Sequence, residues 1–231
     1  MTDLNNLTCI AHRGASGYEP ENTLRAFARA IELNCPWLEL DVHMADGYIM
    51  VIHDEDLSRT TNGNGKMSDC SYEYLRKLDA GHGQSIPTLA EVLSLVSHRA
   101  RVNIELKGHG AAEPVCSLLK DLSWGPQEFL ISSFDHEELA QVDNSFTRGA
   151  LFNRRVDSYV DAAKRINAKI IILDRRLTTR TEIDHAHEAG MELWVYTVNK
   201  PKHISKLKAL GADGIFSDFP DRAIKIASEG R

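Results

Sequence analysis

The stretch IAHRGASGYEPENTLRAFARAI, residues 10–31, decides the fold because it joins a strand to a helix in one short unit. It opens on an apolar run that ends in the polar pair His12 and Arg13, crosses a loop, and continues into an amphipathic segment from Glu21 onwards. Short β-branched runs followed by amphipathic stretches recur to the end of the chain. The repeated unit is therefore a strand followed by a helix.

Eight such runs are predicted as strands: residues 8–12, 37–43, 101–107, 129–134, 148–152, 169–173, 192–197 and 213–216. Eight strand–helix units in 231 residues favour an α/β fold of the closed (β/α)8 TIM-like barrel type. An open doubly wound sheet is the alternative. No linker or low-complexity segment interrupts the pattern, so we expect residues 1–231 to form a single domain.

The segment from residue 45 to residue 87 breaks this rhythm and is predicted to be a small insertion after the second strand. It holds an apolar run at 48–53, a turn rich in Gly and Asn at 62–65 and a short helix near 72–78. In a barrel, the loops that follow the C-terminal ends of strands build the active site. We therefore expect this insertion to lie over the pocket.

Composition limits the function classes. The net charge of −6 argues against a nucleic-acid partner held by a general positive field, and 42% hydrophobic residues suffice for a sizeable core. The four cysteines form no CxxC pair and are predicted to be reduced thiols. With no apolar run of signal-peptide or membrane-spanning length, we expect a cytoplasmic monomer or homodimer without membrane insertion.

Carboxylates stand where a barrel strand would bury apolar residues. In WLELDVHM, residues 37–44, Glu39 and Asp41 are two positions apart and share one face of a strand. A hard divalent metal would offset their repulsion; the alternative is a solvated strand end paired with Lys or Arg. In VNIELKG, residues 102–108, Glu105 and Lys107 are also two positions apart on one strand face. Glu105 is either a third carboxylate at the same level of the barrel or part of an ordinary Glu–Lys strand pair.

Two histidines complete this set of polar residues at strand ends. His12 ends the first strand beside Arg13, and His53 directly follows the alternating run in the insertion. Two imidazoles, three carboxylates, an arginine and a lysine on one rim suit a reaction on a phosphate ester. From the residues alone, Trp194 favours core packing, and Asp218 is predicted to cap the helix that follows it.

Seven segments in order resemble the glycerophosphodiester phosphodiesterase family: AHRGASGYEPENTLRAF, ELDVHMADGYIMVIHDEDLSRTTNGNG, IPTLAEVL, NIELKG, SSFD, VYTVN and GADGIFSDFP. The short, intracellular, bacterial type is the most similar. The resemblance implies a TIM-like barrel that hydrolyses a small-molecule substrate, a glycerophosphodiester, to sn-glycerol 3-phosphate and an alcohol. It also implies one divalent cation, Mg²⁺ or Ca²⁺.

The resemblance further implies roles for ten residues. The metal ligands fall on Glu39, Asp41 and Glu105, and the catalytic histidines on His12 and His53. The substrate-binding positions fall on Arg13, Lys107 and Trp194, the last on the glycerol side of the pocket. Glu21 and Asn22 match positions that support the metal and His12 from behind.

The chain departs from the family in one place. Many members carry an aromatic stretch between the DAG and IPTL segments, whereas here Asp79-Ala80-Gly81 is followed only by residues 82–85. A trimmed lid predicts an open pocket that tolerates several head groups. The alternatives are a phospholipase D-like or phosphoinositide phospholipase-like enzyme, a metal-dependent sugar isomerase or aldolase, and a non-catalytic phosphodiester-binding barrel.

Overall fold

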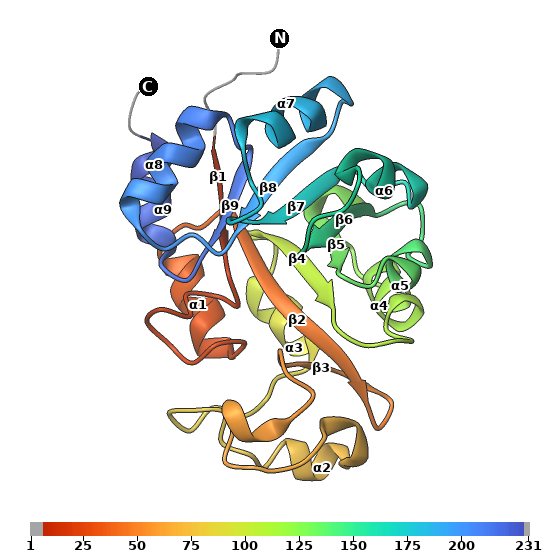
Figure 1. Ribbon diagram of the computed structural model, residues 1–231. Helices are drawn as coiled ribbons and strands as arrows, with labels where there is room; N and C mark the ends of the chain where they lie inside the picture. The colour runs from red at the N-terminus through yellow and green to blue at the C-terminus, as the bar shows by residue number, and fades with distance from the viewer. Residues whose placement is uncertain (1–6, 229–231) are drawn as a thin grey trace.

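The computed structural model describes residues 7–228, and within that range eight parallel strands close into a barrel (Figure 1). They are β1 (Thr8–Ala11), β2 (Trp37–Ala45), β4 (Arg101–Leu106), β5 (Phe129–Ser133), β6 (Thr147–Phe152), β7 (Ile170–Asp174), β8 (Glu192–Tyr196) and β9 (Gly214–Ser217). The strands follow chain order around the circle, which closes because β1 pairs in parallel with both β2 and β9. This closure confirms the predicted (β/α)8 barrel and excludes the open sheet.

Helices follow the strands and surround the barrel (Figure 1). They are α1 (Leu24–Glu32), α3 (Leu89–Val96), α4 (Ala112–Lys120), α5 (His136–Ala140), α6 (Tyr159–Arg165), α7 (Arg180–Glu188), α8 (Pro201–Leu210) and α9 (Pro220–Ser228). Local capping sets where α1 and α3 begin. The Thr23 side chain accepts a hydrogen bond from the N–H of Ala26, and Thr88 and Glu91 form a capping box. Because the caps hold the helix starts, they also fix the loops that leave the strand ends.

Large side chains fill the interior of the barrel below its polar rim. They are Ile10, Trp37, Leu130, Leu151, Ile170, Ile172, Trp194 and Phe216. The rings of Trp37 and Trp194 meet edge to face with their centroids 5.3 Å apart. Gly214 leaves room for Trp194, because a Cβ at that position would lie 2.8 Å from the indole ring. The barrel is therefore a packed core and not a pore.

The predicted insertion forms a small lobe at the end of β2 (Figure 1). Its strand β3 (Tyr48–Val51) pairs antiparallel with β2 around the turn Asp46-Gly47, where both residues have positive φ, and its helix is α2 (Tyr72–Leu75). An Asp-Gly pair suits such a two-residue turn because the turn needs positive φ at both positions. The lobe has an apolar core of its own: Ala45, Met50, Ile52, Leu57, Met67, Leu75, Leu78, Ala80 and Ile86.

The single domain predicted for residues 1–231 includes residues 1–6 and 229–231, which lie outside the described residues. Between residues 7 and 228, the helices are too short or too polar for any of them to cross a membrane.

Candidate active site

Three buried carboxylates meet at one end of the barrel. Glu39 and Asp41 lie on β2, and Glu105 lies on β4, where it is the register partner of Asp41. Glu39 and Asp41 are 1% exposed and Glu105 is 9% exposed. One oxygen of each carboxylate lies within 4.8 Å of an oxygen of the other two. The three residues predicted as metal ligands are thus together in space and shielded from water.

Burial and mutual repulsion disfavour three ionised carboxylates at this position unless a cation binds between them. Burial, followed by the charge of Asp41, raises the pKa of Glu39 to about 8. Burial and the charge of Asp41 also raise the pKa of Glu105. Oε1 of Glu39 and Oδ1 of Asp41 are buried and accept no hydrogen bond from any described residue. A set of carboxylate oxygens with unpartnered lone pairs fits a hard divalent cation.

Two basic side chains border the triad. The backbone N–H of Arg13 donates to Oε2 of Glu39 over 2.7 Å, and Nε of Arg13 lies 3.3 Å from Oδ2 of Asp41. Nζ of Lys107 donates to Oε1 of Glu105 over 2.8 Å. These cations offset part of the negative charge of the triad. Arg13 also lines the pocket beside the triad.

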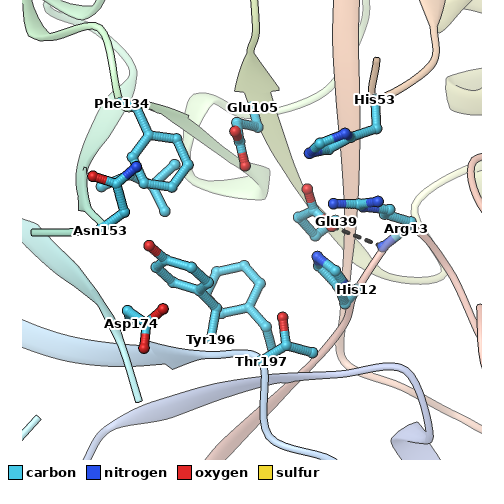
Figure 2. Close-up of a pocket in the computed structure, with 12 residues that line it drawn as sticks. His12, Arg13, Glu39, His53, Glu105, Phe134, Asn153, Asp174, Tyr196 and Thr197 are labelled. Atoms are coloured by element: carbon cyan, nitrogen blue, oxygen red, sulfur yellow. Dashed lines mark hydrogen bonds between the residues drawn. The ribbon is translucent and has the colours of Figure 1, made fainter. Parts of the chain in front are cut away.

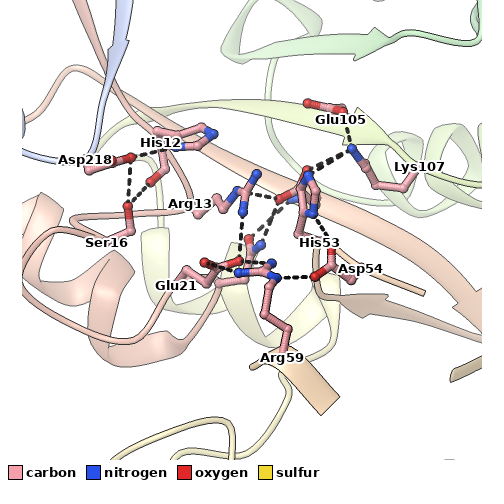
Figure 3. A network of polar contacts seen from close by, with 12 residues as sticks. His12, Arg13, Ser16, Glu21, His53, Asp54, Arg59, Glu105, Lys107 and Asp218 are labelled. Atoms are coloured by element: carbon pink, nitrogen blue, oxygen red, sulfur yellow. Dashed lines mark hydrogen bonds and ion pairs between the residues drawn. The ribbon is translucent and has the colours of Figure 1, made fainter. Parts of the chain in front are cut away.

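Glu21 and Asn22 support this arrangement from the loop that follows β1. The side-chain amide of Asn22 donates to Oδ2 of Asp41 over 2.8 Å. Glu21 accepts hydrogen bonds of 2.8 Å from Arg13 and from Arg59 (Figure 3). The predicted supporting role is therefore divided between the two residues: Asn22 orients a carboxylate of the triad, whereas Glu21 orients Arg13.

His12 faces the pocket with a carboxylate behind it (Figure 3). Nδ1 of His12 lies 2.7 Å from Oδ1 of Asp218, and Asp218 also accepts from Ser16 and Asn199. Burial lowers the pKa of His12, but the hydrogen bond with Asp218 and the charge of Glu39 outweigh it and leave that pKa raised. The prediction that Asp218 caps the next helix is wrong, because the chain after β9 brings its carboxylate back to His12.

His53 has the same kind of pairing at Nδ1 and a different neighbour at Nε2. Nδ1 lies 2.5 Å from Oδ1 of Asp54, and Nε2 lies 3.2 Å from Nζ of Lys107. A lysine ammonium only donates, so Nε2 of His53 accepts, and the ring is neutral. Burial lowers the pKa of His53, and the charges of Lys107 and Arg13 lower it further against the opposing charge of Asp41.

Both histidines, together with Glu39 and Glu105 of the triad, line a pocket of about 290 Å³ (Figure 2). Among its lining residues only His53 comes from the insertion. The insertion was expected to lie over the pocket, but it only borders it. The side opposite His53 is formed by residues that sequence reasoning missed: Phe134, Asn153, Asp174, Tyr196 and Thr197. Each lies at or directly after the C-terminal end of a strand, and that position was the signal that could have found them.

Trp194 does not line this pocket. It is 2% exposed, packs against Trp37 in the barrel interior, and donates from Nε1 to Glu192 over 2.8 Å. Side chains two positions apart share one face of a strand, so Tyr196 takes the pocket position above it. The prediction of Trp194 as a substrate-binding residue is therefore wrong, because its side chain lies in the packed interior of the barrel below the pocket. The residue pattern alone had predicted that core position.

Comparisons with known proteins agree with this geometry. The model of the glycerophosphoryl diester phosphodiesterase family matches residues 12–222. A glycerophosphodiester phosphodiesterase of Bacillus altitudinis is 36% identical in an alignment that covers 95% of this chain and 98% of that protein. A human lysophospholipase D is 25% identical in an alignment that covers 92% of this chain and 83% of that protein. The structure of an Oleispira antarctica phosphodiesterase in complex with the product sn-glycerol-3-phosphate has a TM-score of 0.90 at 28% identity and covers 96% of both chains. The chain therefore belongs to the glycerophosphoryl diester phosphodiesterase family.

Proposed function

We propose that this phosphodiesterase hydrolyses glycerophosphodiesters to sn-glycerol 3-phosphate and an alcohol, using one divalent cation and two histidines of opposite protonation. The observation that carries the proposal is the convergence of His12 and His53 on one pocket beside the buried triad. The Oleispira antarctica relative supports the choice of product. The reaction consumes one water for each ester bond broken.

Glu39, Asp41 and Glu105 would hold the cation. Their ligand set consists of oxygen only, which favours Mg²⁺ or Ca²⁺ over softer metals. The bound cation supplies Lewis acidity, which polarises a non-bridging oxygen of the phosphate. Arg13 and Lys107 neutralise the remaining charge on the phosphate, because both ammonium and guanidinium groups donate strong charge-assisted hydrogen bonds to it.

The two histidines divide the proton transfers. Nε2 of His53 removes the proton from the attacking oxygen, which belongs either to water or to the neighbouring glycerol hydroxyl. The Nε2–H group of His12 gives a proton to the oxygen of the departing alcohol. Asp54 and Asp218 hold the Nδ1–H side of each ring and so keep Nε2 directed at the substrate.

The test is a direct assay. Purified protein is incubated with glycerophosphocholine and either Mg²⁺ or Ca²⁺, and the release of glycerol 3-phosphate is measured. We expect release with at least one of the cations and none after exhaustive chelation. The double variant His12→Ala/His53→Ala is the control for contaminating activity. Activity that survives chelation would defeat the metal assignment, and hydrolysis of lysophosphatidylcholine alone would point to a phospholipase D-like enzyme.

We also propose a cytoplasmic location and a monomeric or homodimeric state. The four cysteines, Cys9, Cys35, Cys70 and Cys116, are all free, which suits a reducing compartment. Cell fractionation and light scattering on the purified protein check these two points.

A further inference from the structure

A second cavity of about 450 Å³ lies beside the catalytic pocket and shares three lining residues with it. The shared residues are Phe134, Leu151 and Asn153. Phe134 and Asn153 stand on the side of the catalytic pocket opposite His53 and Arg13 (Figure 2). A substrate whose phosphate lies beside the triad can therefore extend past Phe134 and Asn153 into this second cavity.

The two volumes suggest how a diester would be accommodated. At about 290 Å³ the catalytic pocket is at the lower end of the range for small-molecule sites. A phosphate with one glycerol fits such a volume, whereas an additional large alcohol needs further space. Two other cavities, near Leu7 and near Tyr159, share no lining residue with the catalytic pocket. The cavity past Phe134 adjoins the catalytic pocket through three shared lining residues and is the nearest space for the larger alcohol.

The walls of the second cavity combine apolar side chains with arginines that have no carboxylate partner among the described residues. Phe152 and Val156 supply apolar surface, and Arg154 and Arg165 supply two guanidinium groups. Among the residues that the structure describes, no carboxylate lies at salt-bridge distance from either arginine. Arginines without carboxylate partners at a cavity wall favour an anionic ligand, because the planar fork matches phosphate and carboxylate.

A cationic ligand has no comparable partner on this side. The carboxylate of Asp174 lines the catalytic pocket there, but Arg176 pairs with it through Nε and Nη2 at 2.9 and 2.7 Å. Nε2 of His136, another lining residue of the second cavity, is within 3.1 Å of the carbonyl oxygen of Leu151 and donates to it. As far as the structure describes the chain, the lining of the second cavity therefore holds two guanidinium groups and no carboxylate.

We propose that this second cavity binds the alcohol half of the diester and, through Arg154 and Arg165, selects alcohols that carry an anionic group. The inference rests on the proposed function and names the substrate class for the same site. The alcohol leaves with its own anionic group still attached, and no bond other than the phosphate ester changes. Both carboxylates and phosphates have the required chemistry, and the experiment separates them.

The experiment compares matched pairs of substrates. Glycerophosphoserine and glycerophosphoethanolamine differ only by a carboxylate, and glycerophosphoinositol 4-phosphate and glycerophosphoinositol differ only by a phosphate. All four release glycerol 3-phosphate, so one assay serves for kcat/KM. The variants are the double substitution Arg154→Gln/Arg165→Gln and the control Arg155→Gln. Arg155 is as exposed as its neighbour but does not line the cavity.

We expect the wild type to prefer the anionic member of at least one pair by about tenfold in kcat/KM, the value of one charge-assisted hydrogen bond. The double variant should lose this preference, chiefly through KM, and keep its activity on the members without the additional anionic group within about twofold. Arg155→Gln should behave as the wild type. A preference in one pair only identifies the anion as carboxylate or phosphate.

Three results would overturn the inference. The first is equal kcat/KM within both pairs for the wild type. The second is an equal loss in Arg155→Gln, which would indicate diffuse surface charge instead of a site. The third is an equal loss by the double variant on substrates with and without the additional anionic group. If the wild type releases glycerol 3-phosphate neither from any of the four substrates nor from glycerophosphocholine, the proposed function fails as well, so the two failures are distinguishable.

Discussion

His12 and His53 occupy the same pocket with similar exposure, yet the structure gives them opposite affinities for a proton. Their side chains are 19% and 26% exposed, and each has an aspartate at Nδ1. The difference lies in the groups around each ring: Lys107 faces Nε2 of His53, whereas the hydrogen bond with Asp218 and the charge of Glu39 raise the pKa of His12. Burial lowers the pKa of both rings, and their different neighbours separate the two pKa values, which supports the proposed roles of His12 as acid and His53 as base.

The two aspartates also differ in how they are held. Asp218 is fixed by Ser16 and Asn199, which are neutral, so its charge acts mainly on His12. Asp54 is shared between His53 and Arg59, which together lower its pKa to about 2 against the effect of burial. Because Arg59 takes up part of the charge of Asp54, that carboxylate raises the pKa of His53 less than Asp218 raises that of His12.

The comparison is tested most strongly by removing each ring. His12→Ala and His53→Ala should each lower turnover of glycerophosphocholine by about 10²- to 10⁴-fold. A substrate with a p-nitrophenol leaving group, which departs without a proton, should restore most of the activity of His12→Ala and none of that of His53→Ala. Steady-state kinetics on the two substrates measures this. Equal rescue of both variants would contradict the division of roles.

The aspartates should matter unequally. We expect Asp218→Asn to lower kcat/KM by roughly tenfold, the value of a charge-assisted hydrogen bond, and Asp54→Asn by only a few-fold. Loss of the Asp218 charge should also lower the pKa of His12 and shift the alkaline limb of the pH profile to lower pH. The profiles of the two variants are compared with that of the wild type. An unmoved alkaline limb in Asp218→Asn would show that Asp218 does not act through His12.

The pH dependence of the wild type follows from the same contrast. His53 must be neutral, and its pKa is lowered, so kcat/KM should fall only below the ordinary histidine value of about 6.5. His12 must be protonated, and its pKa is raised, so kcat/KM should fall only above that value. The expected profile is a bell with its plateau across pH 6.5 and about a tenfold loss per unit beyond each limb. A profile without a plateau at pH 6.5, in which kcat/KM already falls on one side of that value where a plateau is expected, would contradict the assignment.

The smallest expected effect concerns the stability of the metal-free protein. The pKa of Glu39 is about 8 in the folded chain and 4.5 in the unfolded chain, so the folded state holds the extra proton between these values. The free energy of unfolding should therefore fall as pH rises from about 5 to 8 in the presence of a chelator, lowering Tm by a few degrees. Glu39→Gln should reduce this slope, and the raised pKa of Glu105 accounts for part of the remainder. A Tm that rises over the same range in the wild type would contradict the prediction.

Most of the polar residues of the site could be predicted from the sequence, because side chains two positions apart on a strand share one face. Glu39, Asp41 and Glu105 were found from alternation along two strands, and His12 from its place after a third. His53 joined this set because it directly follows the alternating run in the insertion, and the family resemblance gave it a catalytic role. The pocket wall around Tyr196 was missed because an aromatic residue at a strand end has no distinguishing pattern of its own.

The level that a side chain occupies along the barrel axis could not be predicted in the same way. Trp194 and Tyr196 share a strand face, and only the register of β8 against its neighbours decides which of them reaches the pocket. The residue pattern favoured core packing for Trp194, and the resemblance moved it to the pocket. The strand register shows that the first interpretation was right.

By itself, the sequence determined the eight strand–helix units, the insertion and the face on which each carboxylate lies, because these depend on local periodicity. Only the tertiary structure decided which charges act on each histidine. Asp218 reaches His12 across 206 positions of the chain, and Lys107 reaches His53 across 54. Such contacts depend on barrel closure and strand register, and a proton affinity depends on distances that no local pattern encodes.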